Sequence, residues 1–221
     1  METTVIDQAL VTPPPSGTRA ALIAAGLNLF GHRGFEATST RQLAVQAGTN
    51  VASIAYHFRG KDGLRVACAA EVVRQFHLAV GSSEATPPTS QQAARLRIEE
   101  MARAFILFLT GSHAADDLTA FLLREITQNS PVIDQIYTAM MEPKHRELCA
   151  LWGIATGQPP ESAVVRLSVF AFLGQMLYFR IGHQIVERRM GWTIGTSPNA
   201  AAIADVVIGN LRVLLTERAS T

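Results

Sequence analysis

Apolar residues recur at intervals of three and four along most of this chain, which is the spacing of one face of an α-helix. In the first such segment, about residues 18–31, the apolar side chains that share a face are Ala21, Leu22, Ala25, Leu29 and Phe30. Ser16 or Thr18 can cap the start of this helix. Gly31 or Gly34 can end it, so the pattern predicts an amphipathic first helix.

Two short helical segments follow, separated by a turn that contains glycine. The first, TSTRQLAVQAG, begins with residues that can cap a helix and ends at Gly48, a residue type that easily adopts the left-handed conformation. After the turn, Asn50 can cap a helix over about residues 51–57, and a longer helix begins near Lys61. Two short helices joined by such a turn form a helix-turn-helix, whose second helix enters the DNA major groove.

The remainder of the chain also shows the helical period, and it contains no alternating strand of useful length. Loops rich in Gly, Pro, Ser and Thr divide it into segments. The predicted helices cover about residues 92–110, 116–128, 131–153, 161–189 and 198–218. The sequence therefore predicts an all-α fold of about nine helices.

The composition, 48% apolar and 17% charged, is typical of a globular protein. Residues 1–17 contain two acids, no base and three successive prolines, unlike a secretory signal, and are expected to form a disordered tail. The longest uncharged apolar run in the second half, residues 167–179, is shorter than the roughly 20 residues of a transmembrane helix. Cys68 and Cys149 have no metal-binding spacing and suit a reducing cytosol. These features predict a soluble, cytoplasmic protein.

The charge of the chain is distributed unevenly. Residues 16–75 hold seven Lys and Arg residues against three acids, whereas the remaining residues sum to −3. A basic module beside a mildly acidic one is expected where only one part of a chain meets phosphates.

Within this module, Ala52 and Ala55 are small enough to let a helix approach bases closely. Donors for base edges and phosphates are Ser53, Tyr56, His57 and Lys61.

Several segments resemble those of a known family. The patterns F..RGFEATS, LA..AG and YHF..K..L, within residues 18–70, resemble the DNA-binding domain of TetR-family transcriptional regulators. FLLREITQNSPVIDQI, PKHRELCALWGIATG, FLGQMLYFRIG and GWT resemble the C-terminal half of the CecR-like subgroup. The resemblance implies an all-α homodimer with a helix-turn-helix DNA-binding domain over residues 18–63 and a helical effector-binding and dimerisation domain over residues 64–221.

The resemblance also implies which residues contact DNA. They are Thr40, Arg41, Asn50, Val51, Ala52, Ser53, Tyr56, His57 and Lys61. Arg41 is the expected guanine contact, because an arginine can donate two hydrogen bonds to that base, and the small apolar residues fit thymine methyl groups. Many family members have an aromatic residue at the place of Ala55, so its absence leaves more of the backbone contact to Tyr56. His57 is equally suited to capping or packing.

Polar side chains within apolar helices are candidates for orienting a small-molecule effector. The residues predicted to line an effector pocket are Arg103, Phe105, Phe121, Arg124, Glu125, Met141, His145, Phe172, Gln175 and Tyr178. The aromatic and methionine side chains of this set can equally be ordinary core. Arg124 and Glu125 are better explained as residues that satisfy one another or bond a neighbouring helix.

Two helices near the C-terminus carry features of a subunit interface. Glycines within the first of them each cost a helix about 1 kcal/mol relative to alanine, which close approach of another helix could offset. The last helix presents an apolar stripe. The residues predicted at the dimer interface are therefore Gly174, Gly182, Ile203, Val207, Leu211 and Leu214. Burial of these residues within one subunit is the alternative.

One helix face has possible metal ligands. Glu142, His145 and Cys149 lie on that face, and Glu-x-x-His is a motif of di-iron bundles. Such a centre needs two of these pairs and two further Glu residues, but the sequence has one pair. It also has no nucleophile elbow and no glycine-rich phosphate loop. A helical-bundle metal-binding protein or enzyme is therefore the alternative function, and no metal or cofactor is expected.

Together these observations predict a DNA-binding transcriptional regulator and not an enzyme. The expected mechanism is that of a repressor, which binds a pseudo-palindromic operator as a homodimer and is released by a small-molecule inducer. The expected partners are double-stranded operator DNA, a second copy of the chain and an effector, without a membrane. The expected location is the cytoplasm, with nucleoid association when the protein is bound to DNA.

Overall fold

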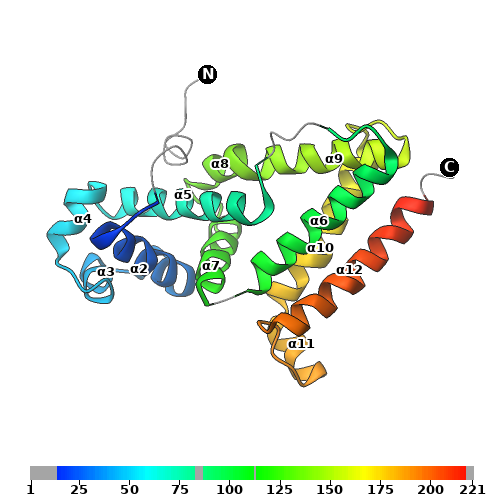
Figure 1. Ribbon diagram of the computed structural model, residues 1–221. Helices are drawn as coiled ribbons and strands as arrows, with labels where there is room; N and C mark the ends of the chain where they lie inside the picture. The colour runs from blue at the N-terminus through cyan, green and yellow to red at the C-terminus, as the bar shows by residue number, and fades with distance from the viewer. Residues whose placement is uncertain (1–13, 83–86, 112, 218–221) are drawn as a thin grey trace. The chain divides into compact units, whose positions relative to one another are not determined.

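The computed structural model describes residues 14–82, 87–111 and 113–217, and its elements are helices joined by loops (Figure 1). In chain order they are α2 (Gly17–Arg33), α3 (Thr40–Gln46), α4 (Val51–Phe58), α5 (Lys61–Val80), α6 (Gln91–Thr110), α7 (His113–Thr127), α8 (Ile133–Ile136), the π-helical turn η1 (Tyr137–Met141), α9 (Glu142–Thr156), α10 (Ala163–Ile181), α11 (His183–Met190) and α12 (Ser197–Glu217). These residues contain no strand, which confirms the predicted all-α fold. Of the predicted tail, residues 1–13 lie outside the described residues, and Gly17 already begins α2.

The described chain forms two compact units. The first contains residues up to His77 together with His113–Met141, and the second contains Leu78–Ser112 and the residues from Glu142 onward. In the first unit, α2, α3 and α4 gather near one end of α5, and α7 packs along α2 (Figure 1). Helix α7 therefore belongs to the same compact unit as the helix-turn-helix, although it is distant from it in sequence.

Capping residues set the starts of α3 and α4, as the sequence predicts. Ser39 accepts a hydrogen bond from the backbone N–H of Gln42, and the Gln42 side chain accepts one from the N–H of Ser39, which together form a capping box. At the start of α4, Asn50 accepts from the backbone N–H of Ser53. Arg59, with a φ of 61°, turns the chain out of α4. Local sequence thus fixes the length of both helices.

Helices α2 and α7 pack closely because Gly31 has no side chain. A Cβ atom at Gly31 would lie 2.8 Å from the backbone nitrogen of Phe121, closer than real Cβ atoms come. Beside this contact, the Arg124 guanidinium donates a hydrogen bond to the Gly31 carbonyl at 2.8 Å. Asp117 on α7 lies 2.9 Å from the ring nitrogen Nε2 of His32 on α2. The close approach of the two backbones and these polar contacts together hold α7 against α2, the helix that precedes the helix-turn-helix.

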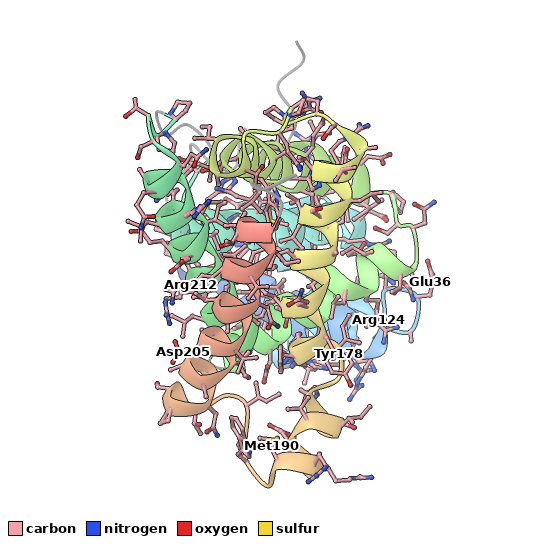
Figure 2. All side chains as sticks on the ribbon, turned by 90° about the vertical axis from the view of Figure 1, so that its right-hand side faces the viewer. Glu36, Arg124, Tyr178, Met190, Asp205 and Arg212 are labelled. Carbon is pink, nitrogen blue, oxygen red and sulfur yellow. The ribbon has the colours of Figure 1, made fainter. Side chains whose placement is uncertain are left out.

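The second unit is built around α6, which packs against α9, α10 and α12. Trp152 on α9 is fully buried in this core. Two ion pairs join α6 to α12, Glu99 with Arg212 at 2.7 Å and Arg103 with Asp205 at 2.9 Å. Figure 2 labels the two α12 members, Asp205 and Arg212. The Arg212 guanidinium donates hydrogen bonds to Glu99 and holds the pKa of that carboxyl below its usual value. The last helix is therefore fixed to the unit by burial and by charge.

Two predicted helices have different bounds in the structure. The segment predicted as one helix over residues 161–189 is divided into α10 and α11 at Gly182, which ends α10 and donates its backbone N–H to the Tyr178 carbonyl. The segment predicted over residues 131–153 contains the turn η1 and continues to Thr156. Glycine is a weak helix former, and a π-helical turn shifts the helical register by one residue. The spacing of apolar residues alone reveals neither the break at Gly182 nor the turn η1.

Among the described residues, two single helices are long and apolar enough to cross a membrane, judged by length and composition alone. They are Ala163–Ile181 and Ser197–Thr216, with mean hydropathies of 1.4 and 1.3. The uncharged run 167–179 lies inside the first of these helices, which continues through Arg166 and Arg180, so the length of the run understates the length of the apolar helix. Only 22% of its most apolar stretch is buried within the chain, so a large part of its apolar surface is left exposed.

Candidate nucleic-acid interface

The helix-turn-helix is held by buried residues on one side of each helix. Leu43 and Ala44 on α3, together with Ile54 and Phe58 on α4, are buried in the first unit. Burial of these side chains fixes the rotation of each helix about its axis. The remaining faces of α3 and α4 are consequently held toward solvent.

These exposed faces of α3 and α4, which we call the reading head, carry most of the residues predicted to contact DNA. Tyr56 is 85% exposed and Val51 is 46% exposed, although both are largely apolar. Arg41, Ala52 and His57 are exposed as well. The rings of Tyr56 and His57 meet edge to face, with centroids 4.9 Å apart. The exposed faces of the two short helices thus combine apolar surface with Arg41 and Tyr56, side chains that can donate hydrogen bonds to DNA.

Two of the predicted DNA contacts are partly engaged inside the turn. Oδ1 of Asn50 accepts hydrogen bonds from the backbone N–H of Ser53 at 3.0 Å and from its hydroxyl at 3.2 Å. The Ser53 hydroxyl also lies 2.9 Å from that of Thr49. Thr40, another predicted contact, is half-buried. Oδ1 of Asn50 and the Ser53 hydroxyl thus stabilise the start of α4 and are less available to DNA than the family resemblance implies.

Lys61, the predicted phosphate contact on α5, is half-buried beside an aromatic ring. Its ammonium nitrogen lies 4.0 Å from the centre of the Phe35 ring, and the guanidinium carbon of Arg65 lies 4.4 Å from the same ring. Both contacts have the geometry of cation–π interactions. Arg65 in turn forms a buried ion pair with Glu125, with nitrogen and oxygen 2.9 Å apart. The Phe35 ring therefore holds Lys61 next to the reading head. The same ring contacts Arg65, whose position is fixed by the ion pair with Glu125.

Four of the ten predicted pocket residues belong to the first unit. Phe121 is fully buried, and Met141 ends the turn η1. Glu125 accepts hydrogen bonds from Arg65 on α5. Arg124 donates to two backbone carbonyls at the end of α2. The structure supports the structural alternative for Arg124 and Glu125, since each bonds a neighbouring helix.

Six predicted pocket residues belong to the second unit: Arg103, Phe105, His145, Phe172, Gln175 and Tyr178. Phe172 is buried beside Trp152, with ring centroids 6.1 Å apart. Arg103 and Gln175 bond residues of α12. Tyr178 is exposed on α10, where Figure 2 labels it. None of the ten predicted pocket residues lines a cavity found in the second unit.

That cavity has a volume of about 620 Å³ and lies between α6 and α9. Its lining combines apolar side chains, such as Leu96, Leu151 and Ile154, with charged ones, such as Arg97 and Glu147. Small-molecule sites have volumes of about 300–1,000 Å³ and mixed linings of this kind. Sequence reasoning missed these residues because charges at helical spacing are equally typical of a solvated helix face.

The residues predicted at the dimer interface are mostly placed elsewhere. Ile203, Val207 and Leu211 are buried in the core of the second unit, and Leu214 is half-buried, so for this stripe the alternative of burial within one subunit is correct. Gly182 ends α10 and lies against its own Tyr178. Gly174 is exposed, and a Cβ atom there would meet nothing within 4 Å.

A different apolar surface remains exposed on α10 and α12. Leu167, Phe170 and Ile181 on α10, and Val206 and Val213 on α12, are each more than half exposed. Figure 2 shows these two helices side by side on the side that faces the viewer. We call these five residues the α10–α12 face. This face lies on the two helices from which the sequence prediction took its interface residues, but it uses other residues of α12.

The predicted metal-ligand face is occupied by other contacts. Glu142 accepts hydrogen bonds from Arg146, and the ring of His145 stacks on Phe170 with centroids 4.0 Å apart. Burial raises the pKa of the Cys149 thiol to about 11, so this thiol is protonated at neutral pH and is a poor metal ligand. Among the described residues, no group of three His, Cys, Asp or Glu side chains could hold a metal ion. The geometry therefore gives the metal alternative no support.

Both parts of the chain match known protein families. Residues 22–68 match the family described as bacterial regulatory proteins of the tetR family. Residues 94–218 match the C-terminal domain of the HTH-type transcriptional dual regulator CecR. The second match alone covers more than half of the chain.

Individual relatives agree with these matches. The HTH-type transcriptional dual regulator CecR of Shigella flexneri is 31% identical over 201 residues, which cover 88% of this chain and 89% of CecR. The probable HTH-type transcriptional regulator YttP of Bacillus subtilis strain 168 is 31% identical over 132 residues, covering 58% of this chain and 60% of YttP.

Solved structures show the same fold. AibR, in a crystal structure with isovaleryl coenzyme A and operator DNA, matches 87% of this chain and 97% of its own with a TM-score of 0.65 and 18% identity. The matches to the two family models and to CecR confirm the family resemblance predicted from the sequence. The chain belongs to the TetR family of bacterial transcriptional regulators and has a C-terminal domain of the CecR type.

Proposed function

We propose that this regulator binds a pseudo-palindromic operator as a homodimer and represses transcription until a small molecule releases it. The reading head carries the proposal, because Arg41, Val51 and Tyr56 are exposed on two short helices whose other sides are buried. In a helix-turn-helix the second helix enters the major groove. An arginine suits a guanine edge there, and a tyrosine hydroxyl suits a phosphate.

A second copy of the chain is the proposed partner of the α10–α12 face. Monomeric proteins rarely expose contiguous apolar patches larger than a few hundred Å². A symmetric dimer would bury the same face of both copies and present two reading heads to one duplex. Burial in a dimer also accounts for the apolar character of α10 and α12 without a membrane, so we place the protein in the cytoplasm.

The proposed effector is a small molecule, since the structurally similar AibR was crystallised with isovaleryl coenzyme A as well as operator DNA. The cavity between α6 and α9 is the candidate site. Among the described residues, the carboxylates of Glu100 and Glu147 lie 3.7 Å and 4.0 Å from the guanidinium of Arg97 in its lining, so an anionic ligand could make a closer contact. An effector that prefers the conformer unable to bind DNA, with a coupling of 1 to 3 kcal/mol, lowers operator affinity about 5- to 150-fold.

A gel shift tests the reading head. Purified protein is mixed with DNA from upstream of its own gene and with a scrambled duplex, at one stated salt concentration because phosphate contacts depend strongly on salt. The variant Arg41→Ala/Tyr56→Ala is expected to lose roughly tenfold or more in specific affinity, since one bidentate arginine contact contributes about 1–3 kcal/mol. Addition of coenzyme A thioesters to the preformed complex tests release.

The matched control removes the same side chains from exposed positions outside the reading head. Arg188→Ala/Tyr137→Ala should bind the operator like the native protein. If the upstream DNA contains no operator, selection of bound fragments from genomic DNA supplies one. Equal binding to specific and scrambled duplexes, unchanged in the Arg41→Ala/Tyr56→Ala variant, would falsify the assignment of the reading head.

A further inference from the structure

The start of the recognition helix α4 presents methyl groups to solvent. Val51 and Ala52 lie four and three residues before Ala55, so the three side chains share one side of the helix. All three are exposed. Ile54 and Phe58, on the adjoining side of α4, are buried and prevent the helix from rotating its exposed residues inward. We call Val51, Ala52 and Ala55 the methyl face.

The polar groups near the methyl face are already engaged or lie at its edges. Oδ1 of Asn50 accepts two hydrogen bonds from Ser53, and the Ser53 hydroxyl is also 2.9 Å from that of Thr49. The exposed side chains that could donate to DNA lie at the edges of the methyl face: Arg41 on α3, the Nδ2 amide of Asn50 before Val51, and Tyr56 and His57 after Ala55. The first turn of α4 therefore offers a base mainly apolar contact.

An apolar surface in the major groove selects an apolar group on the bases. The four base pairs present hydrogen-bond donors and acceptors there, and thymine adds a C5-methyl group. A hydrogen-bonding edge pressed against the Val51 side chain would lose water and gain no partner, which is unfavourable. Contact with a thymine methyl has no such cost and removes apolar surface from water.

The size of the methyl face indicates how many bases it covers. Residues one helical turn apart, such as Val51 and Ala55, have Cβ atoms about 5–6 Å apart. Base pairs follow one another at about 3.4 Å along the duplex, so this distance spans about two steps. We infer that Val51, Ala52 and Ala55 read thymine C5-methyl groups, and that each operator half-site has at least two neighbouring thymines where α4 enters the groove. The inference rests on the proposed operator binding.

Deoxyuridine substitution isolates the methyl contact. Deoxyuridine lacks the C5-methyl group of thymine and keeps its hydrogen-bonding edge. The operator is located by footprinting, and its thymines are then replaced one at a time. Replacement of a contacted thymine should lower the affinity of the protein for the operator about fourfold, which corresponds to roughly 0.8 kcal/mol for one buried carbon group. Thymines just outside the footprint control for effects of deoxyuridine on the duplex.

Two matched protein variants assign the contact to α4. Val51→Ala removes two methyl groups from the methyl face. At the thymine that Val51 contacts, the ratio of the affinities for thymine and for deoxyuridine should therefore fall from about four toward one. Val45→Ala makes the same chemical change at an exposed position on α3 and should leave the preference intact.

Three results would count against the inference. Specific binding with equal affinity for thymine and deoxyuridine at every position of the half-sites overturns it and leaves operator binding standing. A thymine preference that Val45→Ala abolishes and Val51→Ala preserves overturns the assignment to α4. Absence of specific binding to any DNA overturns the proposed function itself, and the inference with it.

Discussion

At the residue scale, the buried charge pair of the first unit is the sharpest target for mutation. Glu125 on α7 is 1% exposed, and Arg65 on α5 reaches its two carboxylate oxygens at 2.9–3.1 Å. Glu125→Gln keeps the shape but leaves the charge of Arg65 buried without a counter-charge. We expect the free energy of unfolding to fall by about 3 kcal/mol, near the lower end for broken buried pairs, because the amide oxygen still accepts a hydrogen bond. Chemical denaturation at a fixed protein concentration measures this change.

An exposed ion pair supplies the control. Glu142→Gln makes the same substitution opposite Arg146 on the surface, where the loss should stay below about 1 kcal/mol. The double variant Arg65→Met/Glu125→Leu should recover much of the stability, because it removes both buried charges. Equal effects of Glu125→Gln and Glu142→Gln would contradict a stabilising role for the buried pair.

Residue-scale interactions were predictable where both partners lie close together in the sequence. The cap at Asn50 could be predicted because its partner, Ser53, is three residues away. Arg65 and Glu125 are 60 residues apart, so the sequence could suggest that Glu125 has a structural partner but could not identify it. The engagement of Ser53 within the turn was also missed, since hydroxyl orientation depends on the folded backbone.

At the element scale, two exposed glycines point to close approach between helices of two subunits. Gly174 on α10 and Gly209 on α12 would place an added Cβ atom in open space within one subunit. Each nevertheless costs its helix about 1 kcal/mol relative to alanine. In the proposed dimer, the bare backbone at Gly174 lets the partner helix come near. Gly174→Leu should therefore block dimerisation and leave helix content unchanged, as measured by sedimentation equilibrium and circular dichroism.

A graded substitution at the same position separates crowding from helix propensity. Gly174→Ala should raise the stability of the single subunit by up to about 1 kcal/mol, because alanine is the better helix former. It should weaken the dimer less than Gly174→Leu, whose side chain is larger. A native dimer in Gly174→Leu would place the subunit interface on another surface.

Helix α12 shows why periodicity identified an element but not its partner. Ile203, Val207 and Leu211 form one apolar stripe, and Val206 and Val213 extend apolar character to another side. A helix that is apolar on two sides can face the core with either one, and its sequence does not rank them. The structure buries the first stripe within the subunit and leaves the second exposed.

At the scale of the whole molecule, short motifs predicted more than composition did. The motifs F..RGFEATS, LA..AG and YHF..K..L indicated the family, which the family models and CecR then confirmed. The cavity between α6 and α9 could not be predicted, since its lining comes from helices whose charges resemble an ordinary solvated surface. A compact unit made from two separated stretches, such as residues 14–77 with residues 113–141, likewise cannot be predicted from local sequence patterns.

The proposed dimer predicts how the operator must be spaced. Two recognition helices on a rigid dimer reach half-sites on one side of the duplex, about 34–36 Å apart, which is one helical turn. Five base pairs inserted between the half-sites rotate one of them by about half a turn, so the dimer can then engage only one. Gel-shift affinity should fall to that of an isolated half-site.

Further duplexes and the dimerisation variant complete this test. Ten inserted base pairs restore the facing of the half-sites but add about one turn of distance, so a rigid dimer should bind that duplex weakly as well. Gly174→Leu, which is expected to be monomeric, should bind all three duplexes equally and weakly. If native protein binds the original and the five-base-pair duplex with equal affinity, each reading head reaches DNA independently, and a rigid dimer cannot be the species that recognises the operator.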